Sequence, residues 1–311
     1  MSLSIALAVH NEEKNIIRCL ESVYDWVDEI VIVDGASTDK TIQTINEFVA
    51  NFNQLKPIKT NSNQLKLILT NNPAMFHINK QKAIEACTKD WILQLDADEV
   101  VSKELREEIL EVLKGQNSNV KTQNQNSKLK TEKPIITNSN QLEPIAYWIP
   151  RLNYFLGKPL RKGGQYPDYT IRLYRNGVAR FPCETVHEQV KISDGRTPGV
   201  TGTGSPGVEE ERQPIKTQIG FLKADLLHFP YPTFSEYLNK WHRYNTLEAD
   251  KLKNKGVKPS VPLFIDYCMI KPIVWFLKTY FRHKGFMDGV PGFVFSFFSA
   301  LRYCEIYLKL I

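Results

Sequence analysis

The chain has 311 residues, of which 42% are hydrophobic and 24% are charged, with 17 prolines and 16 glycines. This composition excludes a fibrous repeat and a wholly disordered polymer, and it supplies enough apolar side chains for a sizeable core. The net charge of +6 is concentrated in residues 220–311, which hold 13 Lys and Arg against 7 Asp and Glu and 20 of the 34 aromatic residues. Such a segment is typical of a surface that meets anionic lipid headgroups, or of an aromatic core under solvated lysines.

The first 114 residues alternate short β-rich runs with helical patterns, which predicts a parallel sheet covered by helices. The expected strands are Leu3–Val9, Glu29–Val33, Leu65–Leu69 and Trp91–Leu95. Helices are expected at about 12–24, 38–50, 78–87 and 102–113, with Ser37 or Thr38 and Ser102 as N-caps.

Three low-complexity insertions interrupt this pattern, at about 51–64, 115–144 and 193–216. The first two share a repeat, because Thr60–Ile68 and Thr137–Ile145 are identical at 7 of 9 positions. Segments of this kind bury too little apolar surface to offset the entropy of ordering them. We therefore expect them to be loops on a complete fold.

Two more strands are expected after the second insertion, at 145–155 and 169–174, the latter followed by a turn at Asn176-Gly177. The tail from Thr233 onward has a helical pattern, and prolines are expected to break it at Pro259, Pro262, Pro272 and Pro291. The predicted organisation is one domain over 1–230 and a helical, aromatic and basic extension over 231–311.

The extension favours docking at a bilayer surface over a fully internal helix. Its run Pro291–Leu301 is apolar nearly all round and lies beside Arg282, Lys284, Arg302 and Lys309. The longest apolar stretch, Gly289–Leu301, is too short to span a membrane. The N-terminus has no signal-peptide pattern, and the five cysteines form no C-x-x-C pair. We expect a cytoplasmic protein, peripheral on the inner face of the plasma membrane.

Polar residues follow three of the predicted strands at their carboxyl ends, where ligands collect in open α/β sheets. They are His10-Asn11-Glu12, Asp34, and the pair Asp96 and Asp98. An acid after the second strand suits a ribose, and an Asp-x-Asp turn suits Mg²⁺ or Mn²⁺ with phosphate oxygens as further ligands. Each signal has a structural alternative, because Asp34 can be a turn residue and Asp98 a helix N-terminal acid.

The order and spacing of these blocks resemble those of the family 2 glycosyltransferases. The blocks are Ala8–Glu13, Ile32–Asp39 and Leu93–Glu99, and the later segments Gly164–Arg175 and Val186–Glu188 are similar to the lipopolysaccharide core β-glucosyltransferase branch. The resemblance implies an α/β GT-A fold, a Rossmann-like nucleotide-sugar domain with a mostly parallel central sheet, here with a C-terminal helical extension. It covers most of the chain apart from the insertions.

The resemblance also implies roles for individual residues. His10, Asn11, Glu12, Asp34 and Asp96 would bind the nucleotide sugar, with Asp34 at the uridine or ribose. Asp96, Asp98 and the later His228 would hold a divalent cation, Mn²⁺ or Mg²⁺. Glu188 would be the catalytic base, with Asp168 as the alternative base.

The predicted activity is inverting transfer of a hexose from a nucleotide-diphosphate sugar, with UDP as the expected nucleotide, to a glycan or lipid-linked acceptor. Arg161, Lys162, Arg172 and Arg175 either meet an anionic acceptor or the diphosphate, or form a solvated strand face. No basic stripe with a reader motif predicts nucleic-acid binding.

Three other functions compete with this prediction. A nicotinamide oxidoreductase needs a glycine-rich first turn, which residues 10–15 lack. A phosphatase with an aspartate nucleophile would leave Asp34 unexplained. The remaining alternative is a membrane-associated, non-catalytic nucleotide-sugar-binding protein.

Overall fold

The computed structural model describes residues 1–55, 64–115, 144–183, 189–193, 219–231 and 233–311. Most of the three predicted insertions, and the candidate base Glu188, lie outside these ranges. The chain forms two compact units. The first consists of Met1–Ile149 and Tyr169–Asp225, and the second of Pro150–Asp168 and Leu226–Ile311.

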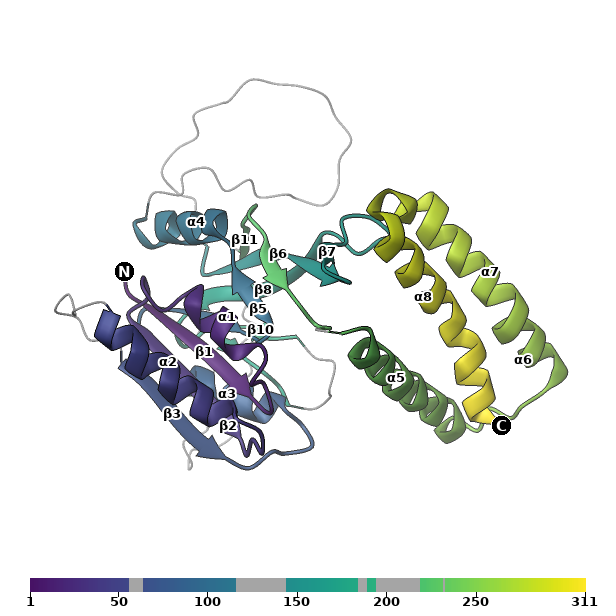
Figure 1. Cartoon of the computed structure of the whole chain (residues 1–311), viewed down its shortest axis with the longest axis horizontal. Coiled ribbons are helices and arrows are strands. Elements are labelled where there is room, and N and C mark those ends of the chain that lie inside the picture. The colour runs from purple at the N-terminus through teal and green to yellow at the C-terminus, as the bar shows by residue number, and fades with distance from the viewer. Residues whose placement is uncertain (56–63, 116–143, 184–188, 194–218, 232) are drawn as a thin grey trace, which may run out of the picture. The chain divides into compact units, whose positions relative to one another are not determined.

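The first unit alternates strands and helices as predicted (Figure 1). Its elements up to residue 113 are β1 (Leu3–Val9), α1 (Ile16–Glu21), β2 (Glu29–Gly35), α2 (Thr41–Leu55), β3 (Gln64–Thr70), α3 (His77–Glu85), β4 (Trp91–Leu95), β5 (Glu99–Val101) and α4 (Lys103–Leu113). The later elements are β6 (Ala146–Phe155), β8 (Asp168–Arg175), β9 (Ala179–Arg180), β10 (Lys191–Ile192) and β11 (Ile219–Phe221), of which β6 and β8 each begin or end in the second unit.

The central sheet is mostly parallel. Strands β3, β2, β1 and β4 lie side by side and parallel, β8 is antiparallel to β4, and β6 lies next to β8. The register pairs Val9 of β1 with Asp34 of β2, and Leu7 with Leu95 of β4. Three neighbouring parallel strands therefore end at the same edge of the sheet, and the polar residues that follow them are brought to that edge.

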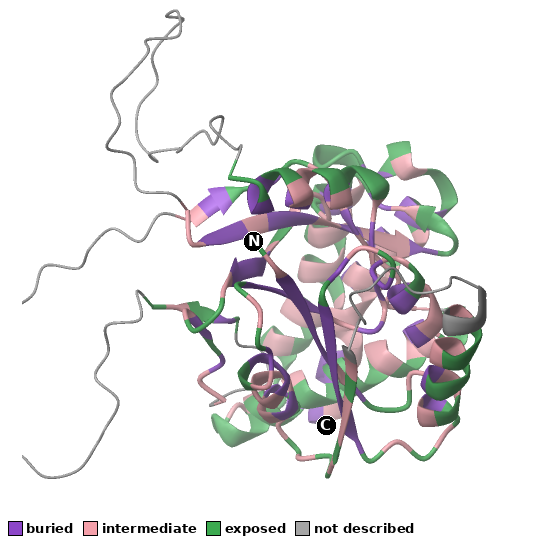
Figure 2. Cartoon of the chain, turned by 90° about the vertical axis from the view of Figure 1, so that its left-hand side faces the viewer, coloured by how far each residue is buried: buried purple, intermediate pink, exposed green. Residues whose placement is uncertain are grey.

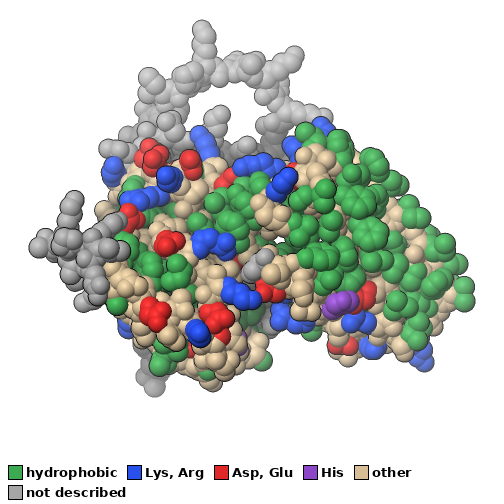
Figure 3. Space-filling model, viewed as in Figure 1, with side chains coloured by type: hydrophobic (Ala, Val, Ile, Leu, Met, Phe, Trp, Pro, Cys, Tyr) green, Lys and Arg blue, Asp and Glu red, His purple; other side chains and the backbone are tan. Residues whose placement is uncertain are grey.

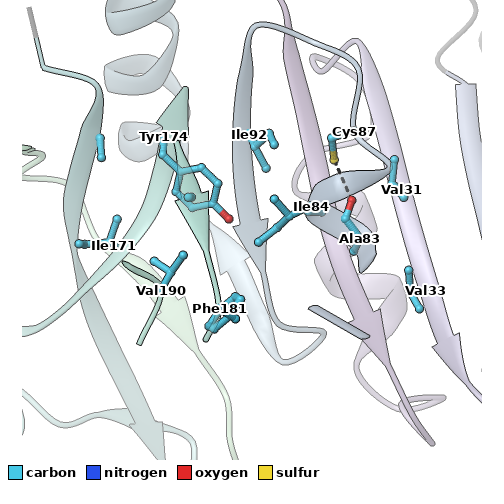
Figure 4. Packing of buried hydrophobic residues seen from close by; sticks show 13 residues of the cluster. Val31, Val33, Ala83, Ile84, Cys87, Ile92, Ile171, Tyr174, Phe181 and Val190 are labelled. Carbon is cyan, nitrogen blue, oxygen red and sulfur yellow. Dashed lines mark hydrogen bonds between the residues drawn. The ribbon is translucent and has the colours of Figure 1, made fainter. Parts of the chain in front are cut away.

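The sheet is the core of the first unit. Every residue of β2 and β4 is buried, which is the pattern of parallel strands covered on both faces (Figure 2). Figure 4 shows how α3 closes one part of this core, where Ala83 and Ile84 lie near Val31 of β2 and Ile92 of β4. The Sγ of Cys87 donates to the carbonyl oxygen of Ala83 at 3.2 Å.

One predicted N-cap is confirmed and one is wrong. The Ser102 side chain accepts a hydrogen bond from the Leu105 N–H, so it caps α4. Helix α2 begins at Thr41, and Ser37 and Thr38 therefore lie in the preceding loop. Their side chains hydrogen-bond within that loop and to the loop after β1, an alternative that Ser and Thr readily offer to helix capping.

The second unit contains β7 (Lys158–Pro159), β12 (Leu226–His228) and the predicted helical tail. Strand β12 is parallel to the second half of β6. The tail consists of α5 (Phe234–Asn254), α6 (Val261–Ile265), η1 (Asp266–Ile270), α7 (Lys271–Phe276), η2 (Leu277–Arg282), η3 (Gly285–Asp288) and α8 (Gly289–Leu310). Tyr237 of α5 packs with Phe155 and Leu160, and Phe295 and Phe298 of α8 join this cluster.

The expected break at Pro272 is wrong. Residues 261–282 follow one another as α6, η1, α7 and η2 without an intervening loop. The π-helical segment η1 ends at Ile270, two residues before Pro272, and such wider turns accommodate the missing N–H and the ring of a proline. Pro262 and Pro291 lie in the first turns of α6 and α8, where proline is tolerated, and Pro259 lies in the loop between α5 and α6.

Close helix packing requires glycine at one position of the tail. A Cβ on Gly292 of α8 would lie 2.0 Å from the carbonyl oxygen of Gly285.

Within the described part of the chain, no helix is both long and apolar enough to cross a bilayer.

Candidate active site

The loops after β1 and β2 are joined by side chains at the edge of the sheet. His10 Nδ1 lies 2.8 Å from the Gly35 carbonyl oxygen, and the Asn11 N–H donates to Ser37 Oγ at 2.9 Å. The Asn11 side-chain oxygen accepts from the Thr38 N–H at 2.8 Å. Asn11 has a left-handed backbone with φ of 57°, a conformation that asparagine adopts more readily than most residues. The structure thus brings the predicted residues His10, Asn11 and Asp34 into one group of loops.

Asp34 is only 1% exposed. Its Oδ2 accepts from the Ser37 N–H at 3.0 Å, and its Oδ1 accepts from Ser37 Oγ at 2.5 Å. Both carboxylate oxygens therefore stabilise the turn after β2. The expected contact between Asp34 and a ribose stays a prediction.

Glu12 fixes the start of the chain segment that leads into α1. Its N–H donates to Thr41 Oγ1 at 2.7 Å, and its Oε2 accepts from Asn15 Nδ2 at 2.8 Å. The first bond ties the loop after β1 to the first residue of α2. Glu12 therefore positions the loops in this structure, and its contact with a nucleotide sugar stays a prediction.

Asp96, directly after β4, is held between two cations. Its Oδ1 lies 2.5 Å from Lys80 Nζ, and its Oδ2 lies 2.6 Å from a guanidinium nitrogen of Arg172. The same nitrogen of Arg172 lies 2.6 Å from Glu99 Oε1, and Glu99 Oε2 accepts from the Asp96 N–H at 2.9 Å. Lys80, Asp96, Glu99 and Arg172 form what we call the charge cluster. Its two positive and two negative charges sum to zero.

Burial strengthens the electrostatics of the charge cluster. The side chains of Glu99 and Arg172 are 0% and 6% exposed, against 25% for Asp96. Burial by itself would raise the pKa of Asp96, but the charges of Arg172 and Lys80 outweigh it and hold that pKa well below its usual value. Asp96 is therefore ionised at neutral pH.

The position of Arg172 differs from both predictions made for it, a contact with an anionic ligand and a place on a solvated strand face. This residue neither faces solvent nor is open to an anionic acceptor, since it is buried between Asp96, Glu99 and Gln94. A signal existed in the sequence, because Arg172 stands between the apolar residues Ile171 and Leu173 of β8, and Gln94 stands between Leu93 and Leu95 of β4. Leu93 of β4 pairs with Leu173 of the antiparallel strand β8. The next residues along this register, Gln94 and Arg172, therefore lie opposite each other, and their side chains form a hydrogen bond.

Lys80 gave no such signal. It is the fourth residue of α3, in a segment with weak helical patterning, and nothing in its neighbours predicts a partner after β4. Only the packing of α3 on the sheet places its ammonium group beside Asp96.

Asp98 is half-buried and follows Asp96 after the buried Ala97. Hard carboxylate oxygens on a turn fit Mg²⁺ or Mn²⁺. Among the residues that the structure describes, no three His, Cys, Asp or Glu side chains are grouped so that they could hold a metal ion. Asp96 and Asp98 are in the first unit and His228 is in the second, and their joint role as metal ligands stays a prediction.

Asp168 and His228 belong to a second polar group, in the second unit. Asp168 Oδ2 accepts from Arg151 Nε at 2.9 Å and from Asn153 Nδ2 at 3.3 Å. Asn153 Oδ1 lies 2.6 Å from Nδ1 of His228 on the neighbouring strand β12. Asn153 thus links the alternative base to the candidate metal ligand. The preferred base Glu188 lies outside the described residues, and its role stays a prediction.

Comparisons with known proteins identify the family to which these residues belong. The profile described as "Glycosyl transferase family 2" matches residues 4–180, more than half of the chain. The lipopolysaccharide core biosynthesis glycosyltransferase LpsC of Rhizobium meliloti is 26% identical over 97% of this chain and 92% of its own length. An uncharacterised glycosyltransferase of Rickettsia typhi is 25% identical over 98% of this chain and 86% of its own.

Solved structures show more distant likenesses. The crystal structure of S. aureus TarS 1-349 in complex with UDP covers 93% of this chain, with 75% of its own chain matched, 15% identity and a TM-score of 0.45. The glucosyl-3-phosphoglycerate synthase of Mycobacterium tuberculosis, solved with Mn²⁺ and UDP-glucose, covers 32% of this chain, with 34% of its own chain matched, 17% identity and a TM-score of 0.25.

Proposed function

Because the chain belongs to glycosyltransferase family 2, we propose that it transfers a hexose from a UDP-sugar to a hydroxyl group of an envelope glycan or a lipid-linked acceptor. One observation carries this proposal. Asp34 lies near the end of β2, and Asp96 and Asp98 follow β4; these strands flank β1 on either side, and all three are parallel and end at one edge of the sheet, where ligands bind in open α/β folds. The full-length similarity to LpsC supports an envelope acceptor, and it does not favour a non-catalytic binding protein.

The residues after β4 fit a divalent cation. Of the roughly four lone-pair positions of a carboxylate, Asp96 uses three in bonds to Gln94, Lys80 and Arg172, which leaves one at Oδ2 as far as the described residues are concerned. Asp98 adds a second carboxylate. We assign Mn²⁺ or Mg²⁺ to this pair, with His228 as a further candidate ligand. When bound, such a cation offsets the charge that develops on the departing diphosphate.

The charge cluster makes the same edge suitable for a diphosphate. With no net charge of its own, it adds no net repulsion to an incoming anion. Lys80 and Arg172 also keep Asp96 in the ionised form that a cation requires. His10, Asn11, Glu12 and Asp34 are proposed to contact the rest of the nucleotide sugar.

The proposed mechanism is an inverting single displacement. Glu188 removes the proton from the acceptor hydroxyl as its oxygen attacks the anomeric carbon, and the nucleoside diphosphate leaves from the opposite side. General bases of this kind contribute about 10² to 10⁴ in rate. Asp168 is the alternative base. A lipid-linked acceptor would place the reaction at the inner face of the plasma membrane, with the enzyme as a peripheral protein.

A donor panel and two variants test this proposal. Thermal shifts with UDP-, GDP-, ADP- and CMP-sugars, with and without Mn²⁺, identify the donor because a ligand stabilises the fold that binds it. We expect Asp98→Ala and Glu188→Gln each to abolish transfer while the unfolding temperature is kept. Asp250→Ala and Glu107→Gln change exposed acids of the same types and serve as matched controls.

Each result has a defined consequence. Transfer at the normal rate by Glu188→Gln moves the base to Asp168. Full activity of Asp98→Ala contradicts the cation site. A protein that binds a nucleotide sugar but never hydrolyses or transfers it, with Mn²⁺ present, is the non-catalytic alternative.

A further inference from the structure

The helix formed by residues 261–282 exposes apolar side chains where a helix of a soluble protein exposes polar ones. Each of these exposed side chains has another one three or four residues away, which is the spacing of neighbours on a helix surface. They are Val261, Phe264, Ile265, Met269, Ile270, Ile273, Val274, Leu277 and Phe281, with exposures between 43% and 72%. We call these nine residues the apolar face.

Helix α8 and the turn before it extend this surface. Phe286, Met287, Val290, Phe293 and Phe297 are also exposed. Between α7 and α8 lies a hollow of about 360 Å³, lined by Ile273, Phe276 and Leu277 on one side and by Phe293, Phe297 and Leu301 on the other. In Figure 3, hydrophobic side chains gather over α7 and α8 as one broad area. Monomeric soluble proteins rarely leave such an area uncovered.

Positive charge lies at the end of the apolar face. Lys278, Arg282 and Lys284 are exposed there, at the last turn of the helix and just after it. Within the face, Lys271 is half-buried, and its Nζ is paired with Asp266 at 2.7 Å and lies 3.6 Å from the Tyr267 ring centre. The charge of Lys271 is therefore neutralised along the side of the helix.

Within residues 261–304, both acidic side chains have partners. Asp266 and Asp288 are the only acids between residues 261 and 304. Asp266 pairs with Lys271, and Asp288 accepts from the backbone N–H groups of Arg161 and Lys162 at 3.2 and 2.8 Å. The surface is therefore apolar and aromatic with a positive end, which is complementary to an anionic lipid surface.

We propose that the apolar face docks on a bilayer that contains anionic phospholipid. Ile273, Val274 and Leu277 would enter the acyl region, and Lys278 and Arg282 would lie among the headgroups. A second copy of the same surface would carry the same cations and few acids to meet them, so charge favours lipid over a symmetric dimer. The docking concerns the second unit alone and does not depend on the proposed transfer reaction.

The test is binding of the full chain to vesicles, without nucleotide sugar. We expect it to co-sediment with vesicles that contain phosphatidylglycerol and to bind weakly to pure phosphatidylcholine. Ile273→Gln/Leu277→Gln removes two inserted apolar side chains without changing charge and should weaken binding about a hundredfold. Lys278→Gln/Arg282→Gln should weaken binding to the anionic vesicles about tenfold or more. These side chains are exposed, so circular dichroism and the unfolding temperature should stay unchanged.

A matched control comes from exposed leucines elsewhere. Leu69 of β3 and Leu247 of α5 are 66% and 41% exposed and lie outside the apolar face. Leu69→Gln/Leu247→Gln should bind vesicles like the unchanged protein.

Three results would overturn the proposal. They are a protein that stays in solution with anionic vesicles, equal binding by Ile273→Gln/Leu277→Gln, and a stable dimer by light scattering that the same variant dissociates. The last result would make the apolar face an interface between copies of the chain. Loss of transfer with intact vesicle binding would instead contradict the proposed function alone.

Discussion

Replacing Arg172 with methionine tests whether the charge cluster stabilises the first unit. Methionine keeps much of the side-chain length and apolar volume but removes the guanidinium that contacts Asp96 and Glu99. Glu99, with a fully buried side chain, would then lose this ion pair. Breaking a buried ion pair by removing one partner costs about 3–5 kcal/mol. We expect the lower end of this range, because Lys80 still neutralises Asp96 and the Asp96 N–H still donates to Glu99.

Urea unfolding at pH 7, followed by tryptophan fluorescence, measures this cost. With slopes of about 1–3 kcal/mol per molar urea, a loss of about 3 kcal/mol lowers the midpoint by about 1–3 M. The double variant Arg172→Met/Glu99→Gln also removes the charge of Glu99, and it should recover a large part of the stability lost in Arg172→Met. The matched control is Arg180→Met on the exposed side of β9, which should change stability by less than about 0.5 kcal/mol.

The reasoning fails in either of two cases. An unchanged midpoint for Arg172→Met would show that the buried contacts contribute no net stability. A double variant that is less stable by the sum of both single changes would show that Glu99 does not depend on Arg172.

Two further predictions concern acid and thiol chemistry. The pKa of Asp96 is lowered in the folded state, so its ionised form stabilises the fold above its unfolded pKa of about 3.9, and this contribution is lost as the pH falls toward the folded value. The urea midpoint should therefore fall more steeply below about pH 4 in the unchanged protein than in Asp96→Asn, and parallel pH profiles would contradict the assignment. Burial and then the charges of Glu99, Asp98 and Asp96 raise the pKa of the Cys19 thiol, and burial with the charge of Glu29 raises that of Cys87 to about 12. Mass spectrometry after treatment with an aromatic disulfide at pH 8 should find both thiols unlabelled until urea is added, and rapid labelling of the folded protein would argue against their burial.

The alternating pattern of the first 114 residues was sufficient to predict the sheet. Strands β1 and β4 have the predicted bounds, because mostly apolar runs flanked by polar residues leave little freedom in where a buried strand ends. Helix boundaries were less certain. Helix α2 begins at Thr41 because side chains in the preceding loop bond to the loop after β1, and a sequence pattern does not contain that tertiary contact. The continuous helix through Pro272 depends in the same way on a local widening of the turn.

The sequence predicts at which edge of the sheet the candidate site lies, since the strand ends of a parallel sheet determine where polar residues meet. It does not predict the hydrogen bonds and ion pairs within the site. Asp96 is expected to bind a ligand, and the pattern around it does not predict that Lys80 of α3 and Arg172 of β8 also contact it. The pairing of Lys80 with Asp96 becomes apparent only when the packing of α3 on the sheet is known.

Asn11 has a mechanical consequence for the entrance of the proposed nucleotide-sugar site. Its backbone N–H and side-chain oxygen bond to Ser37 and Thr38, so a single residue clasps two connecting segments together. A ligand that displaces one of these loops must displace the other as well, or break the hydrogen bonds that Asn11 makes between them. Binding and release of a donor would then require the two loops to move together. Removing the hydrogen bonds of Asn11 would increase both the association and the dissociation rate of the donor and would weaken its affinity.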